Sequence, residues 1–212
     1  MAFRKMQFDH LPSNPNLNIV LDIIREGICR CAHKLNISDN EDLKNQLLAD
    51  TFNSLGTINE RLWIGVGKEN KTKGKQSRED IYFYLNDDNH TRIHYVEGKR
   101  LPKSNTKFKE EYVVGDNSFG NPSGGIDRFK KGIHGDPDKI LDYGLIAYVE
   151  NNSIEYWLNT VNNSITCNFG SNEVLCETAN TINEYTSLHQ FDCKSECANF
   201  QMYHFWIDLT KE

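Results

Sequence analysis

The stretch SREDIYFYLNDDNHTRIHYVEGKRL, residues 77–101, decides how the chain is expected to fold. Two apolar runs, Ile81–Leu85 and Ile93–Val96, flank the turn-forming residues Asn86-Asp87-Asp88-Asn89. This pattern predicts a β-hairpin with a four-residue connection. In an antiparallel pair the start of one strand lies beside the end of the other. The charged residues that border the hairpin are therefore expected to meet at one end of the sheet.

Those charged residues are Asp80, which opens the first strand, and Glu97-Gly98-Lys99, which closes the second. Glu97 and Lys99 are two positions apart, so their side chains project from the same face of the strand. Hard divalent cations prefer carboxylate oxygens, and a lysine beside the metal can orient and activate a water molecule. The alternative is a solvated rim of charges that form weak surface pairs. A buried strand that runs from Val96 into a charged triplet favours the metal site, since charged groups are rarely buried without partners.

Asp80, the hairpin and Glu97-x-Lys99 together resemble the core motif of the PD-(D/E)XK superfamily of restriction-endonuclease-like nucleases. Glu79 stands in place of the proline that gives the motif its name, at a position that the superfamily keeps loosely. The resemblance implies that Asp80 and Glu97 bind Mg²⁺ or Mn²⁺ and that Lys99 positions the attacking water. The carbonyl oxygen of Gly98 is expected as a further metal ligand, and a bound cation would press the pKa of Lys99 downward.

Many members of that superfamily add a glutamate from a helix before the hairpin, and Glu41 is the best candidate here. Ser38-x-x-Glu41 also fits a capping box, in which the glutamate side chain bonds the backbone at the start of a helix. The two roles compete for one carboxylate. The sequence therefore leaves Glu41 either as a metal ligand or as a helix cap.

Elsewhere the periodicity of apolar residues predicts helices and strands on both sides of the hairpin. Helices are expected at about Asn16–Leu35, Asn40–Leu55 and Asn152–Thr166, with a short helix from Ile126, and strands at Ile58–Val66, Gly144–Val149, Leu188–Asp192 and Met202–Leu209. Tyr112-Val113-Val114 is predicted as a further strand, and the polar segment Gly67–Gln76 as a loop that closes over a substrate. His189 and His204, within the last two strands, are expected to be hydrogen-bonded structural residues. This order favours an α/β sandwich with a mixed central sheet flanked by helices, and the resemblance implies its restriction-endonuclease-like form.

The length of 212 residues suits one domain, 1–212, in which 1–56 form N-terminal helices, 57–150 the catalytic sheet and 151–212 a C-terminal helix and strands. No apolar run is long enough to span a membrane, and the N-terminal segment lacks the apolar stretch of a secretory signal. We therefore expect a cytoplasmic protein that does not bind membranes. Its six cysteines lack a standard zinc spacing, and reduced thiols are expected.

The formal net charge of −6 disfavours a general cationic nucleic-acid binder. Basic residues nevertheless follow the motif in two groups, from Lys99 to Lys109 and from Arg128 to His134. They favour a basic groove beside the acidic site, with lysines on solvated loops as the alternative. The residues expected to bind nucleic acid are Arg100, Lys103, Arg128, Lys130 and Lys131.

Several functional classes are disfavoured because their motifs are missing. The chain has no P-loop, no G-x-S-x-G elbow and no helix-turn-helix or zinc-finger module that would read DNA sequence. We therefore expect a metal-dependent endonuclease, acting on DNA rather than RNA, with a partner subunit such as an ATPase or as a homodimer. EGKRL at 97–101 and YGLIAYV at 143–149 are also similar to segments of small nuclease-like proteins of bacterial anti-phage systems, which implies a role in defence. The alternative is a non-enzymatic interaction subunit with a degenerate nuclease-like fold.

Overall fold

The computed structural model describes residues 14–58, 64–67, 80–103, 106–107, 109–116, 119–179, 181–193 and 198–210. Glu79, residues 68–76 of the predicted substrate loop and residues 59–63 of the first predicted strand lie outside these ranges. Helices and strands follow one another in the order predicted from the sequence. None of the helices within the described ranges is long and apolar enough to cross a lipid bilayer.

The N-terminal part is helical and the remainder mixes strands with two further helices. The helical elements are α1 (Leu17–Cys31), η1 (Ala32–Lys34), α2 (Glu41–Ile58), α3 (Gly125–Lys130), α4 (Ile154–Asn168) and η2 (Ser171–Glu173). The strands are β1 (Ile64–Gly67), β2 (Ile81–Leu85), β3 (Arg92–Leu101), β4 (Asp142–Val149), β5 (Cys176–Glu177), β6 (Glu184–Gln190) and β7 (Asn199–Asp208). The short strand β5 was not predicted, because two exposed residues leave no apolar pattern to detect.

All seven strands form one mixed sheet in the order β1-β2-β3-β4-β7-β6-β5. The pairs β1–β2, β2–β3, β7–β6 and β6–β5 are antiparallel, whereas β3–β4 and β4–β7 are parallel. The central strand β4 is buried along all eight residues, as expected for a strand with parallel neighbours on both sides and helices on both faces. The predicted α/β class with a mixed central sheet is confirmed.

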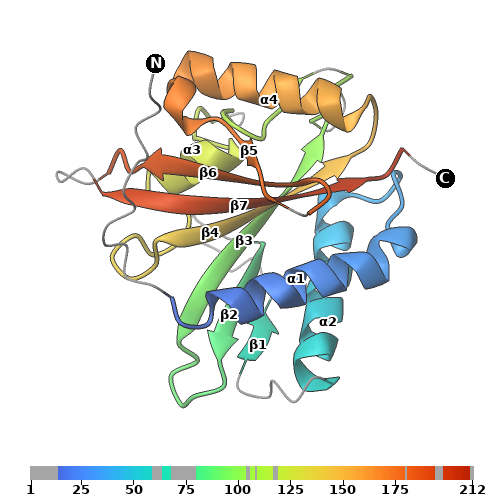
Figure 1. Ribbon diagram of the computed structural model, residues 1–212, viewed down its shortest axis with the longest axis vertical. Coiled ribbons are helices and arrows are strands. Elements are labelled where there is room, and N and C mark those ends of the chain that lie inside the picture. The colour runs from blue at the N-terminus through green and yellow to red at the C-terminus, as the bar shows by residue number, and fades with distance from the viewer. Residues whose placement is uncertain are drawn as a thin grey trace.

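Helices cover the two faces of this twisted sheet in pairs (Figure 1). On one face α1 and α2 pack against sheet residues, and the buried set includes Val20, Ile24, Leu48, Phe52, Ile81, Phe83, Val96, Ile146 and Tyr148. On the other face α3 and α4 do the same, with Tyr95, Phe129, Leu145, Ala147, Trp157, Val161 and Trp206. Neighbouring strand residues such as Tyr95 and Val96 thus belong to different cores, because side chains alternate across a strand.

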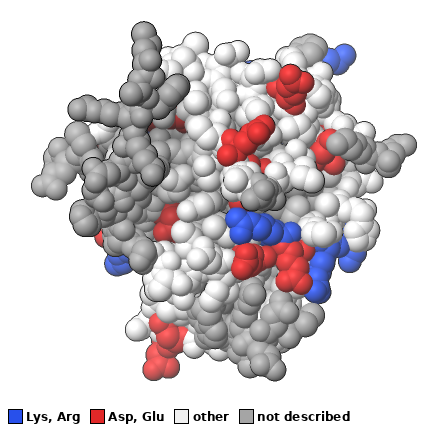
Figure 2. Space-filling view, viewed as in Figure 1, with Lys and Arg blue, Asp and Glu red and all other residues white. Residues whose placement is uncertain are grey.

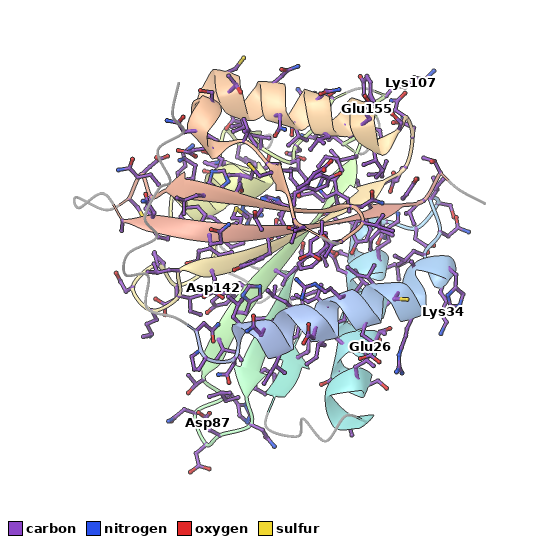
Figure 3. All side chains as sticks on the ribbon, in the orientation of Figure 1. Glu26, Lys34, Asp87, Lys107, Asp142 and Glu155 are labelled. Atoms are coloured by element: carbon purple, nitrogen blue, oxygen red, sulfur yellow. The ribbon has the colours of Figure 1, made fainter. Side chains whose placement is uncertain are left out.

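The predicted hairpin is formed by β2 and β3, but its connection is longer than predicted. Six residues, 86–91, separate the strands instead of four. The carboxylate of Asp87 holds this turn, accepting hydrogen bonds from the amides of Thr91 at 2.9 Å and Asn89 at 3.2 Å. These bonds lower the pKa of Asp87, which lies at the tip of the hairpin in Figure 3. The extra length accommodates His90, whose φ of 47° is in the left-handed region.

The prediction of a strand at Tyr112-Val113-Val114 is wrong. Tyr112 and Val113 are fully buried, yet they belong to an irregular segment that caps α3. The carbonyls of Glu111, Tyr112 and Val113 accept hydrogen bonds of 3.0–3.1 Å from the first three amides of that helix. Those amides have no partner within a helix, so a preceding segment that supplies carbonyls satisfies them. The apolar run therefore reflects burial under α3 and not pairing in the sheet.

A chain of buried polar side chains runs through the core beneath α4. The hydroxyl of Tyr112 lies 2.8 Å from Nδ1 of His204, whose Nε2 lies 2.7 Å from Oγ of Ser187. Ser187 is also 2.7 Å from Nε2 of His189, and Nδ1 of His189 is 2.6 Å from Glu173. Both histidines are thus hydrogen-bonded core residues, as predicted. Burial lowers the pKa of each histidine, well below the ordinary value for His204, so both are held neutral.

This burial predicts a loss of stability in mild acid. An unfolded histidine binds its proton near pH 6.5, whereas the folded His204 does not, so the unfolding free energy falls as the pH drops below that value. Between pH 7.5 and 5.5 the wild type should lose about 1.4 kcal/mol more than the variant His204→Gln, by the linkage relation for one site. Urea unfolding at both pH values measures the difference, with His33→Asn on the surface as control. Equal losses in wild type and His204→Gln would contradict the interpretation.

Candidate active site

The register of the hairpin brings Asp80 beside the middle of β3. Ile81 pairs with Val96, so Asp80, one residue earlier, lies next to Glu97. The amide of Gly98 donates a 2.8 Å hydrogen bond to Oδ2 of Asp80. The structure therefore brings Asp80 and Glu97 to the same position along the sheet, as the antiparallel pattern predicted.

Glu97 is the buried centre of the site, with 1% of its surface exposed. Its Oε1 lies 2.8 Å from Nζ of Lys99 and 3.0 Å from Nη1 of Arg128, and its Oε2 lies 2.9 Å from Nδ1 of His134. Arg128 comes from α3 and His134 from the turn that follows it. The connection between the parallel strands β3 and β4 thus supplies two of the three groups that face this carboxylate. A carboxylate buried this deeply requires such partners.

Glu41, in the first turn of α2, points to the same place. Its Oε1 lies 3.8 Å from Nζ of Lys99, and its Oε2 accepts a 3.3 Å hydrogen bond from the amide of Arg100. Asn40 caps α2 instead, because its Oδ1 accepts a 2.9 Å hydrogen bond from an amide in the first turn. The capping-box interpretation with Ser38 is therefore wrong. Of the two roles left open by the sequence, the geometry favours the one at the site.

Lys99 lies in the interior, although it is only two residues from the end of β3. Only 8% of its surface is exposed, and its ammonium lies among the carboxylates. Burial alone would lower the pKa of Lys99, but the charges of Glu97, Glu41 and Asp80 outweigh burial and raise it. A lowered pKa, as the resemblance implied, would require a cation close to Lys99.

The three carboxylates differ in how easily they are charged. Burial raises the pKa of Asp80 well above its usual range, and the charge of Glu97 raises it further. Burial also raises the pKa of Glu41, against the charge of Lys99. For Glu97 burial is outweighed by His134 and Lys99, among other partners, and the pKa is held well below its ordinary value. Glu97 is therefore firmly ionised, whereas ionisation of Asp80 and Glu41 is unfavourable. An added positive charge would favour the ionised form of both.

Gly98 is required by the packing of α2 against β3. A Cβ atom at this position would lie 2.1 Å from Oδ1 of Asn45, a fully buried residue. The same oxygen accepts a 2.6 Å hydrogen bond from the hydroxyl of Tyr148. The middle residue of Glu97-Gly98-Lys99 is thus small because the helix lies directly on the strand at the site.

This contact predicts that Gly98→Ala destabilises the protein. Overpacking of a tight core typically costs about 1–3 kcal/mol, and we expect a loss of that size. Urea unfolding of Gly98→Ala, Asn45→Ala and the double variant measures it. The double variant should recover about 1 kcal/mol relative to the sum of the single losses, because the clashing oxygen is gone. Strict additivity would show that Asn45 is not what excludes a side chain.

The basic residues predicted to bind nucleic acid separate into three environments. Arg128 lies in the site. Arg100 forms a two-pronged ion pair with Glu150, with nitrogen–oxygen distances of 2.6–2.9 Å, and Lys103 lies 2.8 Å from Glu111. With Lys99 and the start of α2, Arg100 and Lys103 line a cavity of about 350 Å³ that opens beside the candidate site. They are therefore placed to meet a ligand that approaches Lys99.

Lys130 and Lys131 face away from the site. Lys130 is buried and lies 2.8 Å from Glu173, and Lys131 lies 2.7 Å from Asp127. Both line a separate cavity of about 660 Å³ that also contains Asp116 and Asp192. Nor does the face shown in Figure 2 carry an extended basic patch, since its blue residues are few and scattered among red ones. The predicted groove of five basic residues is thus reduced to Arg100, Lys103 and Arg128 near the site.

The side chains of the site have the type of ligand atom that a hard divalent cation prefers. Asp80, Glu97 and Glu41 offer only carboxylate oxygens, the ligands that Mg²⁺ and Mn²⁺ prefer. Within the described ranges, however, no three histidine, cysteine or acidic side chains already surround one metal-sized position. The ammonium of Lys99 contacts Glu97 at 2.8 Å, and a metal that bridged Asp80 and Glu97 would share or displace that contact. The amide of Gly98 contacts Asp80, and the role of its carbonyl oxygen as a metal ligand stays a prediction.

Four residues of the site environment were not predicted as site residues: Asn45, His134, Tyr148 and Glu150. His134 appeared only as one of several basic residues. Its position depends on how the turn after α3 packs, and no local spacing signals that packing. Glu150 follows β4 and joins Arg100 to the fully buried Lys44 at 2.9 Å. Only the alignment of β4 with β3 brings these groups together.

No protein-family model matches this chain, and neither the curated proteins nor the solved structures contain a significant match to it. The geometry of the site and the order of the strands therefore provide the basis for a functional conclusion.

The excess of carboxylates predicts that removing one charge stabilises the protein when no divalent cation is present. Asp80→Asn keeps an acceptor for the amide of Gly98 and removes a buried charge beside Glu97, so the unfolding free energy should rise by about 1 kcal/mol. Thermal and urea unfolding in EDTA test this, with the exposed hairpin variant Asp88→Asn as control. A loss of 1 kcal/mol or more in Asp80→Asn, on the scale of a lost hydrogen bond, would contradict it.

Proposed function

We propose that this protein is a metal-dependent phosphodiesterase of the PD-(D/E)XK type, an endonuclease that acts on DNA. One observation carries the proposal: Asp80, Glu97 and Lys99 meet on a β-hairpin beside a cavity that Lys99 lines, with Glu41 from the preceding helix pointing to the same place. The order of helices, three antiparallel strands, a crossover helix and a parallel strand supports the restriction-endonuclease-like form of the α/β fold. A solvated rim of charges would not place Glu97 and Lys99 in the interior.

In this proposal Asp80 and Glu97, with Glu41, hold Mg²⁺ or Mn²⁺. When bound, the metal would polarise the scissile phosphate and offset the charge that develops on it. Lys99 donates a hydrogen bond to the attacking water and fixes its position, a role suited to an amine already held among carboxylates. Because the pKa of Asp80 is raised, its carboxylate gains most from an added cation.

Arg128 and His134 lie against the Glu97 carboxylate, and Arg128 supplies positive charge beside it. A guanidinium at this position is suited to a phosphate oxygen, with which arginine forms directional, charge-assisted hydrogen bonds. Arg100 and Lys103, which line the adjoining cavity, would contact the backbone of the nucleic acid as it approaches. In this proposal the enzyme works in anti-phage defence, as a homodimer or with a partner such as an ATPase that supplies specificity.

A second candidate is an interaction subunit with a degenerate site. The observation that favours it is the pairing of Glu97 with Lys99, Arg128 and His134, which already compensates its charge without a metal. In that case the charged edge of the sheet would bind a partner protein, and divalent cations would have no effect on the protein.

Nuclease assays distinguish the two candidates. Wild type, Lys99→Met and the exposed control Lys139→Ala are incubated with plasmid, linear and single-stranded DNA and with RNA, in Mg²⁺, Mn²⁺ or EDTA. We expect metal-dependent cleavage that falls at least about 100-fold in Lys99→Met, the scale of a lost proton-transfer group. Methionine preserves the buried volume, and thermal unfolding verifies the fold.

The same preparations are titrated with Mg²⁺ by calorimetry, with Asp80→Asn as the second variant. Binding that Asp80→Asn abolishes supports the metal site even when a partner is needed for cleavage. A folded wild type that neither binds Mg²⁺ nor cleaves any substrate would overturn the enzyme and favour the interaction subunit.

A further inference from the structure

A row of aromatic side chains continues from the candidate site along the same face of the hairpin. Tyr82 on β2 pairs with Tyr95 on β3, and Tyr95 precedes Glu97 by two residues, so all three lie on one face. The rings of Tyr82 and Tyr84 are 5.8 Å apart between centroids, and Tyr84 lies 5.2 Å from the ring of His90. The row thus extends from the site to the turn of the hairpin.

A cation lies on this row. The guanidinium of Arg92 is 4.2 Å from the ring centroid of Tyr82 and 5.6 Å from that of Tyr95. Arg92 and His90 are exposed, and Tyr82 and Tyr84 are half-buried. An arginine on an aromatic face presents both a flat surface and a positive charge to a ligand.

The edge strand β1 is shaped to accommodate the tyrosines. A Cβ at Gly65 would lie 2.3 Å from the ring of Tyr84, and one at Gly67 would lie 2.3 Å from the ring of Tyr82. Glycine weakens a strand, since it has no side chain to pack and loses more entropy on folding. At these two positions it allows the rings to lie close against the backbone of β1, which leaves a shelf of aromatic surface.

We propose that this shelf, formed by Tyr82, Tyr84, His90 and Arg92, is a stacking platform for single-stranded nucleic acid that leads into the candidate site. The proposal rests on the proposed function and names its substrate class, a strand whose bases are unpaired. Aromatic rings bind unpaired bases by stacking, whereas the bases of a duplex are already stacked on one another. Asp80 precedes Tyr82 by two residues, a spacing of about 7 Å along a β-strand, so a nucleic acid stacked on Tyr82 has its next phosphate near Asp80.

Charge supports this occupant over an apolar protein segment. Arg92 lies on the shelf, and at the far end of the row Lys99, Arg128 and Arg100 are near the site. A polyanion that stacks on the tyrosines would meet the positive charge of Arg92 on the shelf, with Arg128 and Arg100 further along the row. Duplex binding depends mainly on rows of exposed phosphate contacts, and the cations near the site are largely paired with carboxylates.

Binding is measured separately from cleavage. Fluorescence anisotropy of a labelled twelve-nucleotide oligo(dT), and of oligo(U), is recorded in EDTA with the full chain. We expect Tyr82→Ala and Tyr84→Ala each to weaken binding about 5- to 100-fold, the scale of one lost base stack, while Tyr82→Phe retains it. Arg92→Gln should weaken binding and lower the salt dependence by about one phosphate contact. The matched control is Tyr156→Ala. Tyr156 lies on α4, is 39% exposed and is far from the hairpin in sequence.

The outcomes separate this inference from the proposed function. Oligonucleotide binding that depends on Tyr82 and Tyr84 supports the platform even if no substrate is cleaved. Cleavage without any effect of the tyrosine variants on binding leaves the nuclease intact and overturns the platform. Preference for a duplex of the same length, or no binding of either oligonucleotide by the wild type, also overturns it.

Discussion

The burial of the Glu97 carboxylate is the constraint on which the rest of the site depends. An ion removed from water costs several kcal/mol unless other charged or polar groups replace the solvent. Here Lys99, Arg128 and His134 do so, from β3, α3 and the following turn. The crossover helix between β3 and β4 must therefore pack where it does for the carboxylate to remain ionised. Fold and site are coupled through this one group.

Features that depend on the local pattern of residues could be predicted from the sequence. The hairpin, the long helices α1, α2 and α4 and the buried strand β4 follow from apolar periodicity, and the meeting of Asp80 with Glu97 follows from antiparallel geometry. The predictions that were wrong concern features that depend on tertiary packing. The apolar run at Tyr112 is a buried cap for α3, and Lys130 and Lys131 pair with carboxylates away from the site. A short sequence pattern does not indicate whether an apolar run pairs in a sheet or packs beneath a helix.

One face of the hairpin carries two different groups of side chains. Where β2 begins and β3 ends, this face carries the carboxylates and Lys99. Near the turn of the hairpin, the same face carries the tyrosines and Arg92. The opposite face of the same strands is apolar and is covered by α1 and α2. Gly98 and the glycines of β1 are needed for related reasons, since each allows a side chain of another element to lie against the backbone. The proposed chemistry and binding thus lie on one face of the hairpin, although both faces contribute to a core, since Tyr95 and Leu101 pack on the side of α3 and α4.

The position of a bound metal shows whether Asp80 and Glu97 form a cation site. Crystals grown or soaked with Mn²⁺ reveal the ion through its anomalous scattering. We expect one or two ions coordinated by Asp80 and Glu97, with Glu41 as a direct or water-bridged ligand and the Lys99 amine moved away from Glu97. An Asp80–Glu97 pair that stays metal-free at saturating Mn²⁺, with Lys99 still paired to Glu97, would contradict it.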